Sequence, residues 1–304
     1  CYGSKPEFNF EPKDHVQIGK KYGLDLEAGA KISGAGFPVF KGKIALLERA
    51  VMQFVLEKAL KKGFEYMQVP VLARPDILQG IGFAPRRDDA QTEIFNLSDD
   101  NLCLSGTAEI GLVGHLVDQT IEGKILPKKL VAYTPCFRRE GGAAGRRDKG
   151  LYRQKNFNKV ELVTVTTPEK AEEALEEILQ FEIEIFNQLG IHFRVVRICA
   201  GDLGAPAFKK YDLEGLMYER HAEGEWGWGE LTSCSNCTDF QARRLGIYYK
   251  DGNAKGRGDL VHTLNGTGIT TRALIPLLEQ FQQEDGRVGV PEVLRPFIGG
   301  GEFL

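Results

Sequence analysis

The sequence predicts an α+β fold, in which a mixed and mostly antiparallel sheet is flanked by helices. Strand-like runs outnumber helices in the middle of the chain, and they do not alternate regularly with helices as in a doubly wound parallel sheet. The chain contains neither G-x-G-x-x-G at the start of a helix nor G-x-x-x-x-G-K-[ST]. A nucleotide site in this chain would therefore be of another kind.

Two long helices are predicted. Apolar residues recur at roughly helical spacing over residues 43–62, and Gly63 follows as a stop. Residues 168–189 form the second predicted helix, because Thr167 suits an N-cap and Gly190 a terminator. Between and around these helices, strands are predicted at residues 64–71 (bent at Pro70), 102–104, 129–134, 160–165 and 193–198.

Bulk composition is ordinary for a globular domain of 304 residues, and the formal net charge is only −3. Nucleic acid would therefore have to be held by local basic patches, or by a part of the protein not present here. The six cysteines form no dense framework, so we expect reduced thiols in a cytoplasmic protein. No apolar run approaches transmembrane length, so we expect no membrane contact.

A cationic hairpin is the most informative segment. Seven Arg or Lys residues fall between positions 138 and 155, on both sides of a Gly- and Ala-rich loop at 141–145. The planar fork of arginine meets two phosphate oxygens at once, so such a hairpin could clamp a triphosphate against a sheet. Phe157 on the return arm could stack on a purine. On charge alone, however, a solvated surface hairpin would be the better interpretation.

The residues around the hairpin carry a more specific pattern. Arg138-Arg139-Glu140, the loop through position 147, and "FNKVE" at 157–161 closely resemble motif 2 of the class II aminoacyl-tRNA synthetases. Four more segments resemble that family's seryl members in the right order: 63–70 (motif 1), "TAE" at 107–109, "GELTSCSNCTDFQARR" at 229–244, and "LNGTGITTRALIPLLEQFQQEDGRVGVPEVLRPFIGG" from 264 (motif 3 and the C-terminal tail). The resemblance extends from about residue 13 to 303.

The resemblance implies that the chain activates serine with ATP and transfers it to tRNA(Ser), with tRNA(Sec) as a second candidate acceptor. Arg138 would bridge the α-phosphate and the serine carboxylate. Glu140 would accept a hydrogen bond from the adenine amino group, and Phe157 would stack on adenine. Arg153 would hold the bent triphosphate, and Arg272 would contact the γ-phosphate. Catalysis would rest on positioning and charge neutralisation.

The resemblance also implies a serine subsite and a metal site. Thr107 and Glu109 would meet the serine amino group, while Glu161 and Thr267 would read the side-chain hydroxyl. The expected Mg²⁺ ligands are Glu230 and Ser233, both hard oxygen donors. No zinc is expected, because the C-x-x-C at residues 234–237 lacks a second ligand pair.

Two departures from the seryl pattern affect these expectations. Arg272 lies one residue closer to the G-x-G element than in the family, and Pro276 follows within the same predicted helix, where proline is disfavoured. The family's N-terminal coiled-coil arm, which grips tRNA, is also absent, since no heptad run occurs. We therefore divide the chain into a polar, loop-like linker at residues 1–20 and a catalytic body at residues 21–304. Either the arm belongs to the full protein and is missing from this sequence, or the chain is an arm-less relative; because the chain begins with Cys1 and not Met, we expect the first.

The class II architecture implies a homodimer that pairs through motif 1. Two alternatives remain open at this point. One is an arm-less paralogue that activates a small amino acid and loads it onto a carrier protein. The other is a non-catalytic, synthetase-like binding protein, which would be expected to lose site residues.

Overall fold

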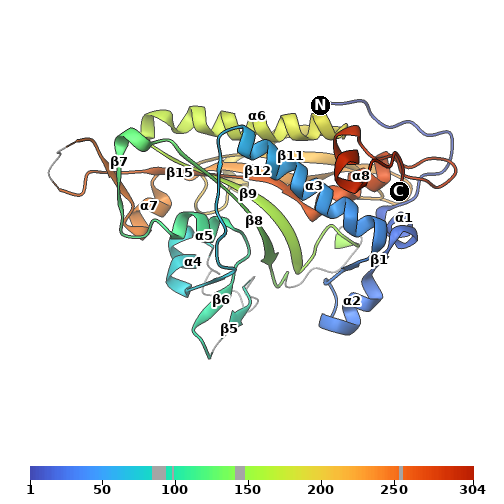
Figure 1. The fold of residues 1–304 in the computed structure, drawn as a ribbon, viewed down its shortest axis with the longest axis horizontal. Coiled ribbons are helices and arrows are strands. Elements are labelled where there is room, and N and C mark those ends of the chain that lie inside the picture. The colour runs from blue at the N-terminus through green and yellow to red at the C-terminus, as the bar shows by residue number, and fades with distance from the viewer. Residues whose placement is uncertain (84–93, 98, 141–147, 253–255) are drawn as a thin grey trace.

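The computed structural model describes residues 1–83, 94–97, 99–140, 148–252 and 256–304 (Figure 1). Its centre is a seven-stranded sheet in which every neighbouring pair is antiparallel except the edge pair β3–β8. In spatial order the strands are β10 (Phe193–Arg197), β11 (Lys209–Tyr218), β12 (Trp226–Asn236), β15 (His262–Thr270), β9 (Asn156–Thr166), β8 (Lys128–Phe137) and β3 (Glu65–Tyr66). The predicted mixed, mostly antiparallel sheet is confirmed.

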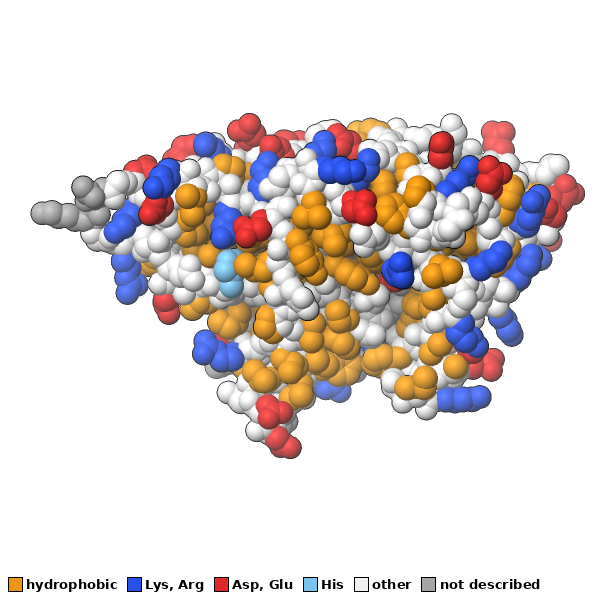
Figure 2. All heavy atoms as spheres, viewed as in Figure 1, with side chains coloured by type: hydrophobic (Ala, Val, Ile, Leu, Met, Phe, Trp, Pro, Cys, Tyr) orange, Lys and Arg blue, Asp and Glu red, His pale blue; other side chains and the backbone are white. Residues whose placement is uncertain are grey.

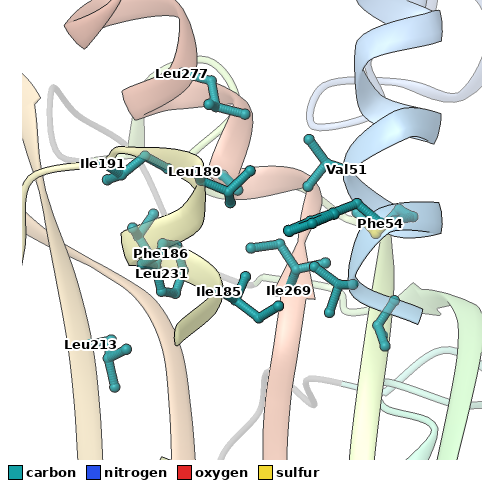
Figure 3. Close-up of a cluster of buried hydrophobic side chains, with 14 of the residues drawn as sticks. Val51, Phe54, Ile185, Phe186, Leu189, Ile191, Leu213, Leu231, Ile269 and Leu277 are labelled. Atoms are coloured by element: carbon teal, nitrogen blue, oxygen red, sulfur yellow. The ribbon is translucent and has the colours of Figure 1, made fainter. Parts of the chain in front are cut away.

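Helices α3 (Gly42–Lys61), α6 (Ala171–Leu189) and α8 (Leu274–Gln280) cover one face of this sheet, together with the 3-10 helix η6 (Glu292–Ile298). Figure 3 shows Phe54 of α3, Phe186 of α6 and Ile269 of β15 converging in the core between helices and sheet. Gly266 and Gly268 of β15 allow this close packing. A Cβ at Gly266 would lie 2.2 Å from Ile178 of α6, so no side chain fits there.

A second buried cluster lies on the opposite face of the sheet, toward one end, beneath α4 (Pro75–Ile81), α5 (Glu109–Gly114) and α7 (Phe240–Leu245). Two small sheets accompany these helices. One comprises β4 (Leu72–Ala73), β6 (Leu102–Leu104) and β5 (Asn96–Leu97); the other comprises β14 (Asp259–Leu260), β13 (Tyr248–Lys250) and β7 (Thr120–Glu122), which leads into η1 (Gly123–Ile125). These elements leave part of the sheet face uncovered.

The remaining short elements either precede α3 or connect strands and helices of the body. They are α1 (His15–Tyr22), β1 (Leu24–Asp25), α2 (Leu26–Ser33), β2 (Val39–Phe40), η3 (Pro168–Lys170), η4 (Ala200–Asp202) and η5 (Thr271–Ala273). Both long predicted helices are confirmed, and so are the four strands predicted from residue 102 onward. The second long helix begins with the 3-10 turn η3, and Thr167 makes no side-chain capping bond.

The strand predicted at 64–71 is wrong in length, because only Glu65–Tyr66 pair with β8. Met67 adds one further backbone bond to Val131, at 2.8 Å. The chain then leaves the large sheet and, after Pro70, which has no N–H to donate, joins β6 through β4.

The loop predicted at residues 1–20 is also wrong in part. Residues 15–22 form α1, whose N-cap Asp14 accepts hydrogen bonds from Val16 N and Gln17 N at 2.8 and 3.0 Å. Gly23 ends the helix in the left-handed conformation. The helix crosses the expected boundary between residues 20 and 21 and contacts α8 of the body.

Pro276 does not disrupt the helix that follows Arg272. It occupies the third position of α8, after Leu274 and Ile275. Backbone N–H groups in a first helical turn have no partner within the helix, so a proline there removes no hydrogen bond. Pro276 is therefore compatible with the helix predicted after Arg272. None of the helices in the described ranges is both long and apolar enough to cross a bilayer.

Candidate active site

The alternation of side chains along β9, β12 and β15 builds the candidate site. Val160 and Leu162 point into the core beneath the helices, whereas Lys159 and Glu161 face the other way, into a cavity of about 500 Å³. Ten of the eleven predicted site residues line this cavity: Thr107, Glu109, Arg138, Glu140, Phe157, Glu161, Glu230, Ser233, Thr267 and Arg272. The fold thus gathers residues that are up to 165 positions apart in the sequence, from Thr107 to Arg272.

Arg138, directly after β8, lies between two aromatic rings. Its guanidinium carbon is 5.7 Å from the centroid of Phe83 and 5.5 Å from that of Phe157. Its Nε donates to the carbonyl oxygen of Gly106 at 3.2 Å. These contacts orient the guanidinium at the cavity wall, where its remaining N–H groups can meet an anion.

Arg153 is the predicted site residue that the cavity lining does not include. Its guanidinium pairs with the carboxylate of Glu140, which does line the cavity, and with Asp148 at 3.3 Å. Glu140 adopts φ 49°, a left-handed conformation that turns the chain at the start of the loop. That loop, residues 141–147, lies outside the described residues, so only the two arms of the predicted cationic hairpin are in view.

Lys159 and Glu161 form a buried ion pair on the cavity face of β9. Lys159 Nζ also donates to the hydroxyl of Thr107 at 2.7 Å. Burial, helped by repulsion from Glu109, raises the pKa of Glu161 to about 7 despite the lysine beside it. Thr267 is the cross-strand neighbour of Glu161, so a hydroxyl, an ammonium and a carboxyl face the same small volume.

Glu109 lies in the first turn of α5, not in the strand-like surroundings that the sequence suggested. Its Oε1 accepts hydrogen bonds from Gln241 Nε2 at 2.7 Å and from Asn265 Nδ2 at 2.8 Å. Burial raises the pKa of this carboxyl. Two amide donors therefore hold the carboxylate of Glu109 in one orientation at the cavity wall.

Arg272 is held by three groups. Its Nε donates to the carbonyl of Tyr152 at 3.1 Å and its Nη1 to the carbonyl of Glu230 at 2.8 Å. The guanidinium also lies 4.5 Å from the ring centroid of Tyr152. The hydroxyl of Tyr152 in turn accepts a hydrogen bond from Glu230 N at 3.1 Å. Tyr152 therefore links the arginine of the third motif to strand β12, and the shortened spacing leaves Arg272 facing the cavity.

The predicted magnesium ligands fit a phosphate-bound cation. Glu230 and Ser233 both face the cavity from β12, on either side of a β-bulge. Mg²⁺ usually takes one or two protein oxygens and completes its shell with phosphate and water. Asp212 is the cross-strand neighbour of Ser233, and burial together with repulsion from Glu230 raises its pKa to about 6. A divalent cation would relieve this repulsion.

The C-x-x-C thiols are packed in the interior. Cys234 and Cys237 are both buried, and burial raises the pKa of each. No group of three or more His, Cys, Asp or Glu among the described residues could hold a metal ion.

Sequence reasoning missed several cavity or supporting residues: Tyr152, Lys159, Asp212, Gln241 and Asn265. Strand alternation could have found two of them. Lys159 lies midway between Phe157 and Glu161, so it shares their face, and Asn265 stands two residues from Thr267 on the same strand. Tyr152 lies outside any regular element and has no such signal.

Comparisons with known proteins decide the family. Residues 92–281 match the model of the tRNA synthetase class II core domain (G, H, P, S and T). The chain is 48% identical to a serine–tRNA ligase of Treponema denticola and 47% identical to one of Rubrobacter xylanophilus, in each case over 98% of this chain and 69% of the relative. This chain belongs to the seryl-tRNA synthetase family. The predicted family and enzyme class, an aminoacyl-tRNA synthetase, are confirmed.

Solved structures of seryl-tRNA synthetases share the fold. The Pyrococcus horikoshii enzyme, crystallised with ATP, superimposes with a TM-score of 0.89 at 38% identity, over 96% of this chain and 64% of that one. A cytoplasmic serine–tRNA ligase from Naegleria fowleri, in complex with AMP, also gives 0.89, at 31% identity over 98% of this chain and 69% of that one. The chain thus spans about two thirds of the length of these seryl-tRNA synthetases.

The raised pKa of Glu161 predicts a pH-dependent stability for this seryl-tRNA synthetase chain. The pKa is about 7 in the folded protein and 4.5 ordinarily, so the folded state holds a proton that the unfolded chain has released. The stabilisation from this group is therefore present below pH 4.5 and is lost as the pH rises through 7. Relative to Glu161→Gln, the unfolding free energy of the parent chain should fall by about 2 kcal/mol between about pH 5 and 8.

Urea unfolding of both proteins across that range measures the difference. Glu184→Gln, at a half-exposed acid on α6, serves as the control: it retains Glu161, so its unfolding free energy should differ from that of the parent chain by a constant amount over this pH range. If the difference in unfolding free energy between the parent chain and Glu161→Gln stayed constant over this range, Glu161 would be ionised throughout.

Proposed function

We propose that this chain is the catalytic body of a serine–tRNA ligase, which activates serine with ATP and transfers it to tRNA(Ser), with tRNA(Sec) as a further candidate acceptor. One observation carries the proposal. Two arginines, Arg138 and Arg272, face one cavity together with the acids Glu109, Glu161 and Glu230. Such a cavity can hold a polyanion and an amino acid side by side.

Serine activation then follows from the positions of these groups. The serine carboxylate attacks the α-phosphorus of ATP; a new O–P bond forms, and the bond to the β-phosphate oxygen breaks to release pyrophosphate. Arg138 neutralises charge at the reacting phosphate, and Arg272 neutralises the departing pyrophosphate. Phe157 provides a stacking surface for adenine, and Glu140, with Arg153 bound behind it, accepts from the adenine amino group. Mg²⁺ held by Glu230 and Ser233 would supply further charge neutralisation.

Serine selectivity would come from hydrogen bonds to its hydroxyl. Glu161 and Thr267 would contact the hydroxyl, while Thr107 and Glu109 would receive the ammonium. A buried site built for a hydroxyl rejects alanine strongly, because its polar groups would be left without partners. Lys159 supports this subsite, since it holds both Glu161 and Thr107 in place.

The alternatives from the sequence have less support. A non-catalytic binding protein would not be expected to retain this set of charged groups around one cavity. A carrier-protein ligase would use the same activation chemistry, so the acceptor distinguishes it. We propose a cytoplasmic enzyme whose catalytic body includes residues 13–304, because α1 belongs to the folded body.

Serine-dependent ATP–pyrophosphate exchange tests the activation step. We expect exchange with serine, and about 100-fold less with alanine or threonine. Arg272→Ala should lower serine-dependent exchange by about 10²–10³-fold, because it removes a charge that faces the leaving group. Arg287→Ala, at an exposed arginine paired with Asp285, is the matched control and should leave exchange unchanged.

Near-normal exchange in Arg272→Ala would refute the role of Arg272. No exchange with any amino acid would favour the binding protein. Exchange that is followed by loading of a carrier protein, and not of tRNA(Ser), would favour the paralogue.

We also propose a homodimer that pairs through the motif 1 region. Leu46 and Leu60 of α3 and Tyr66 of β3 are large apolar side chains that are 44–47% exposed. Figure 2 shows hydrophobic side chains gathered in the middle of the face on which α3 lies. The edge strand β3 is also short, with only Glu65–Tyr66 paired to the sheet. A partner could therefore pack against this apolar region without displacing a strand of the sheet.

Leu46→Asp combined with Tyr66→Glu should convert the dimer into a monomer, because both changes place a charge in an apolar contact. Analytical ultracentrifugation at micromolar concentration measures the mass. Ile32→Glu, at an equally apolar but more exposed position on α2, should remain dimeric. A parent chain that sediments as a monomer would contradict the proposed interface.

A further inference from the structure

The start of α1 contacts the arm of the hairpin that leads to Tyr152. His15 is buried, with 6% of its surface exposed, although it precedes the expected start of the catalytic body. Its Nδ1 lies 2.8 Å from Glu279 Oε1 on α8, and its Nε2 lies 3.1 Å from the backbone nitrogen of Leu151. One imidazole therefore joins three segments of the chain.

The donors around this imidazole define its tautomer. The backbone N–H of Leu151 can only donate, so Nε2 must accept. The ring proton is therefore on Nδ1 and is donated to Glu279. The carboxylate of Glu279 also accepts from His15 N at 2.9 Å and from Tyr218 N at 2.8 Å. Each of these buried polar groups thus has a partner of the correct kind.

The turn that contains Leu151 is fitted closely to this segment. Lys149 Nζ lies 2.5 Å from Asp14 Oδ2. Gly150 adopts φ 64°, and a Cβ there would lie 2.3 Å from His15 Nε2. Any side chain at Gly150 would displace the imidazole, so residues 149–151 lie against Asp14 and His15 in a single arrangement.

The same turn leads directly to the candidate site. Tyr152 follows Leu151, and its carbonyl and ring hold Arg272 while its hydroxyl contacts Glu230 N. A displacement of Leu151 by about one ångström would therefore move Tyr152, whose carbonyl and ring contact Arg272. Misplacement on that scale is sufficient to weaken catalysis.

We propose that Asp14 and His15 form a clamp that positions Tyr152, and through it Arg272 and Glu230, for ATP binding. Both are positioning residues, because neither lines the cavity. The inference rests on the proposed serine–tRNA ligase function for its kinetic consequence. Its structural consequence, slower hydrogen exchange of the backbone in the turn at 149–151, does not depend on that function.

His15→Asn separates the two hydrogen bonds of the imidazole. The asparagine amide can still donate to Glu279 from near the Nδ1 position, but it has no acceptor at the position of Nε2. Lys149→Met removes the ion pair at a half-exposed lysine and so provides a variant with little risk to folding. Tyr22→Phe is the matched control, because it removes a 2.8 Å bond between the other end of α1 and Gly286.

Two measurements on the full chain test the clamp. In serine-dependent exchange, His15→Asn should raise KM for ATP about fivefold or more, as expected for a lost hydrogen bond, with KM for serine within about twofold. Lys149→Met should change KM for ATP in the same direction, and Tyr22→Phe should change neither KM. In hydrogen–deuterium exchange, His15→Asn should take up deuterium faster than the parent chain in the peptide at residues 148–154, which contains Leu151, and peptides away from this turn should be unchanged.

The outcomes separate the clamp from the proposed function. Faster deuteration at 148–154 with an unchanged KM for ATP would overturn the positioning role, and unchanged deuteration would overturn the clamp itself. A lower melting temperature with both KM values unchanged would indicate a purely structural role and also overturn it. A parent chain without serine-dependent exchange would refute the proposed function, while the deuteration result would still test the contact.

Discussion

The whole arrangement depends on side-chain alternation in strands β9, β12 and β15. Each strand sends apolar or small residues to α3 and α6 and polar residues to the cavity, so Val160 lies in the core while Lys159 and Glu161 line the cavity. A shift of one residue in register would bury Glu161 under the helices and expose Val160 to the cavity. Core packing and the geometry of the site are therefore maintained by the same constraint.

Much of the fold could be predicted because its signals are local. The helices at 42–61 and 171–189 have long apolar periodicities, and the central strands have dense apolar runs. The predictions were wrong at elements whose structure is decided by contacts with distant parts of the chain. Of residues 64–71, only Glu65–Tyr66 pair with the large sheet, since its edge ends there. Helix α1 is short and its composition polar, so its burial against α8 has no strong sequence signal.

The site could be predicted only through its resemblance to a family, because its parts are distant in sequence. Ten of the eleven predicted residues line one cavity, yet nothing in the spacing of Thr107, Arg138 and Thr267 shows that they meet. The supporting residues were less predictable. Tyr152 accepts from Arg272 through its own backbone carbonyl, and His15 accepts from the backbone nitrogen of Leu151; such contacts depend on the exact path of the chain.

The central claim is that the cavity above the sheet binds ATP between Arg138 and Arg272. A crystal structure of this chain with ATP and Mg²⁺ tests that claim most directly. We predict the α-phosphate within hydrogen-bonding distance of Arg138, the adenine ring on Phe157, and the triphosphate directed toward Arg272 and Glu230. A nucleotide bound elsewhere on the chain, with this cavity holding only solvent, would contradict the account.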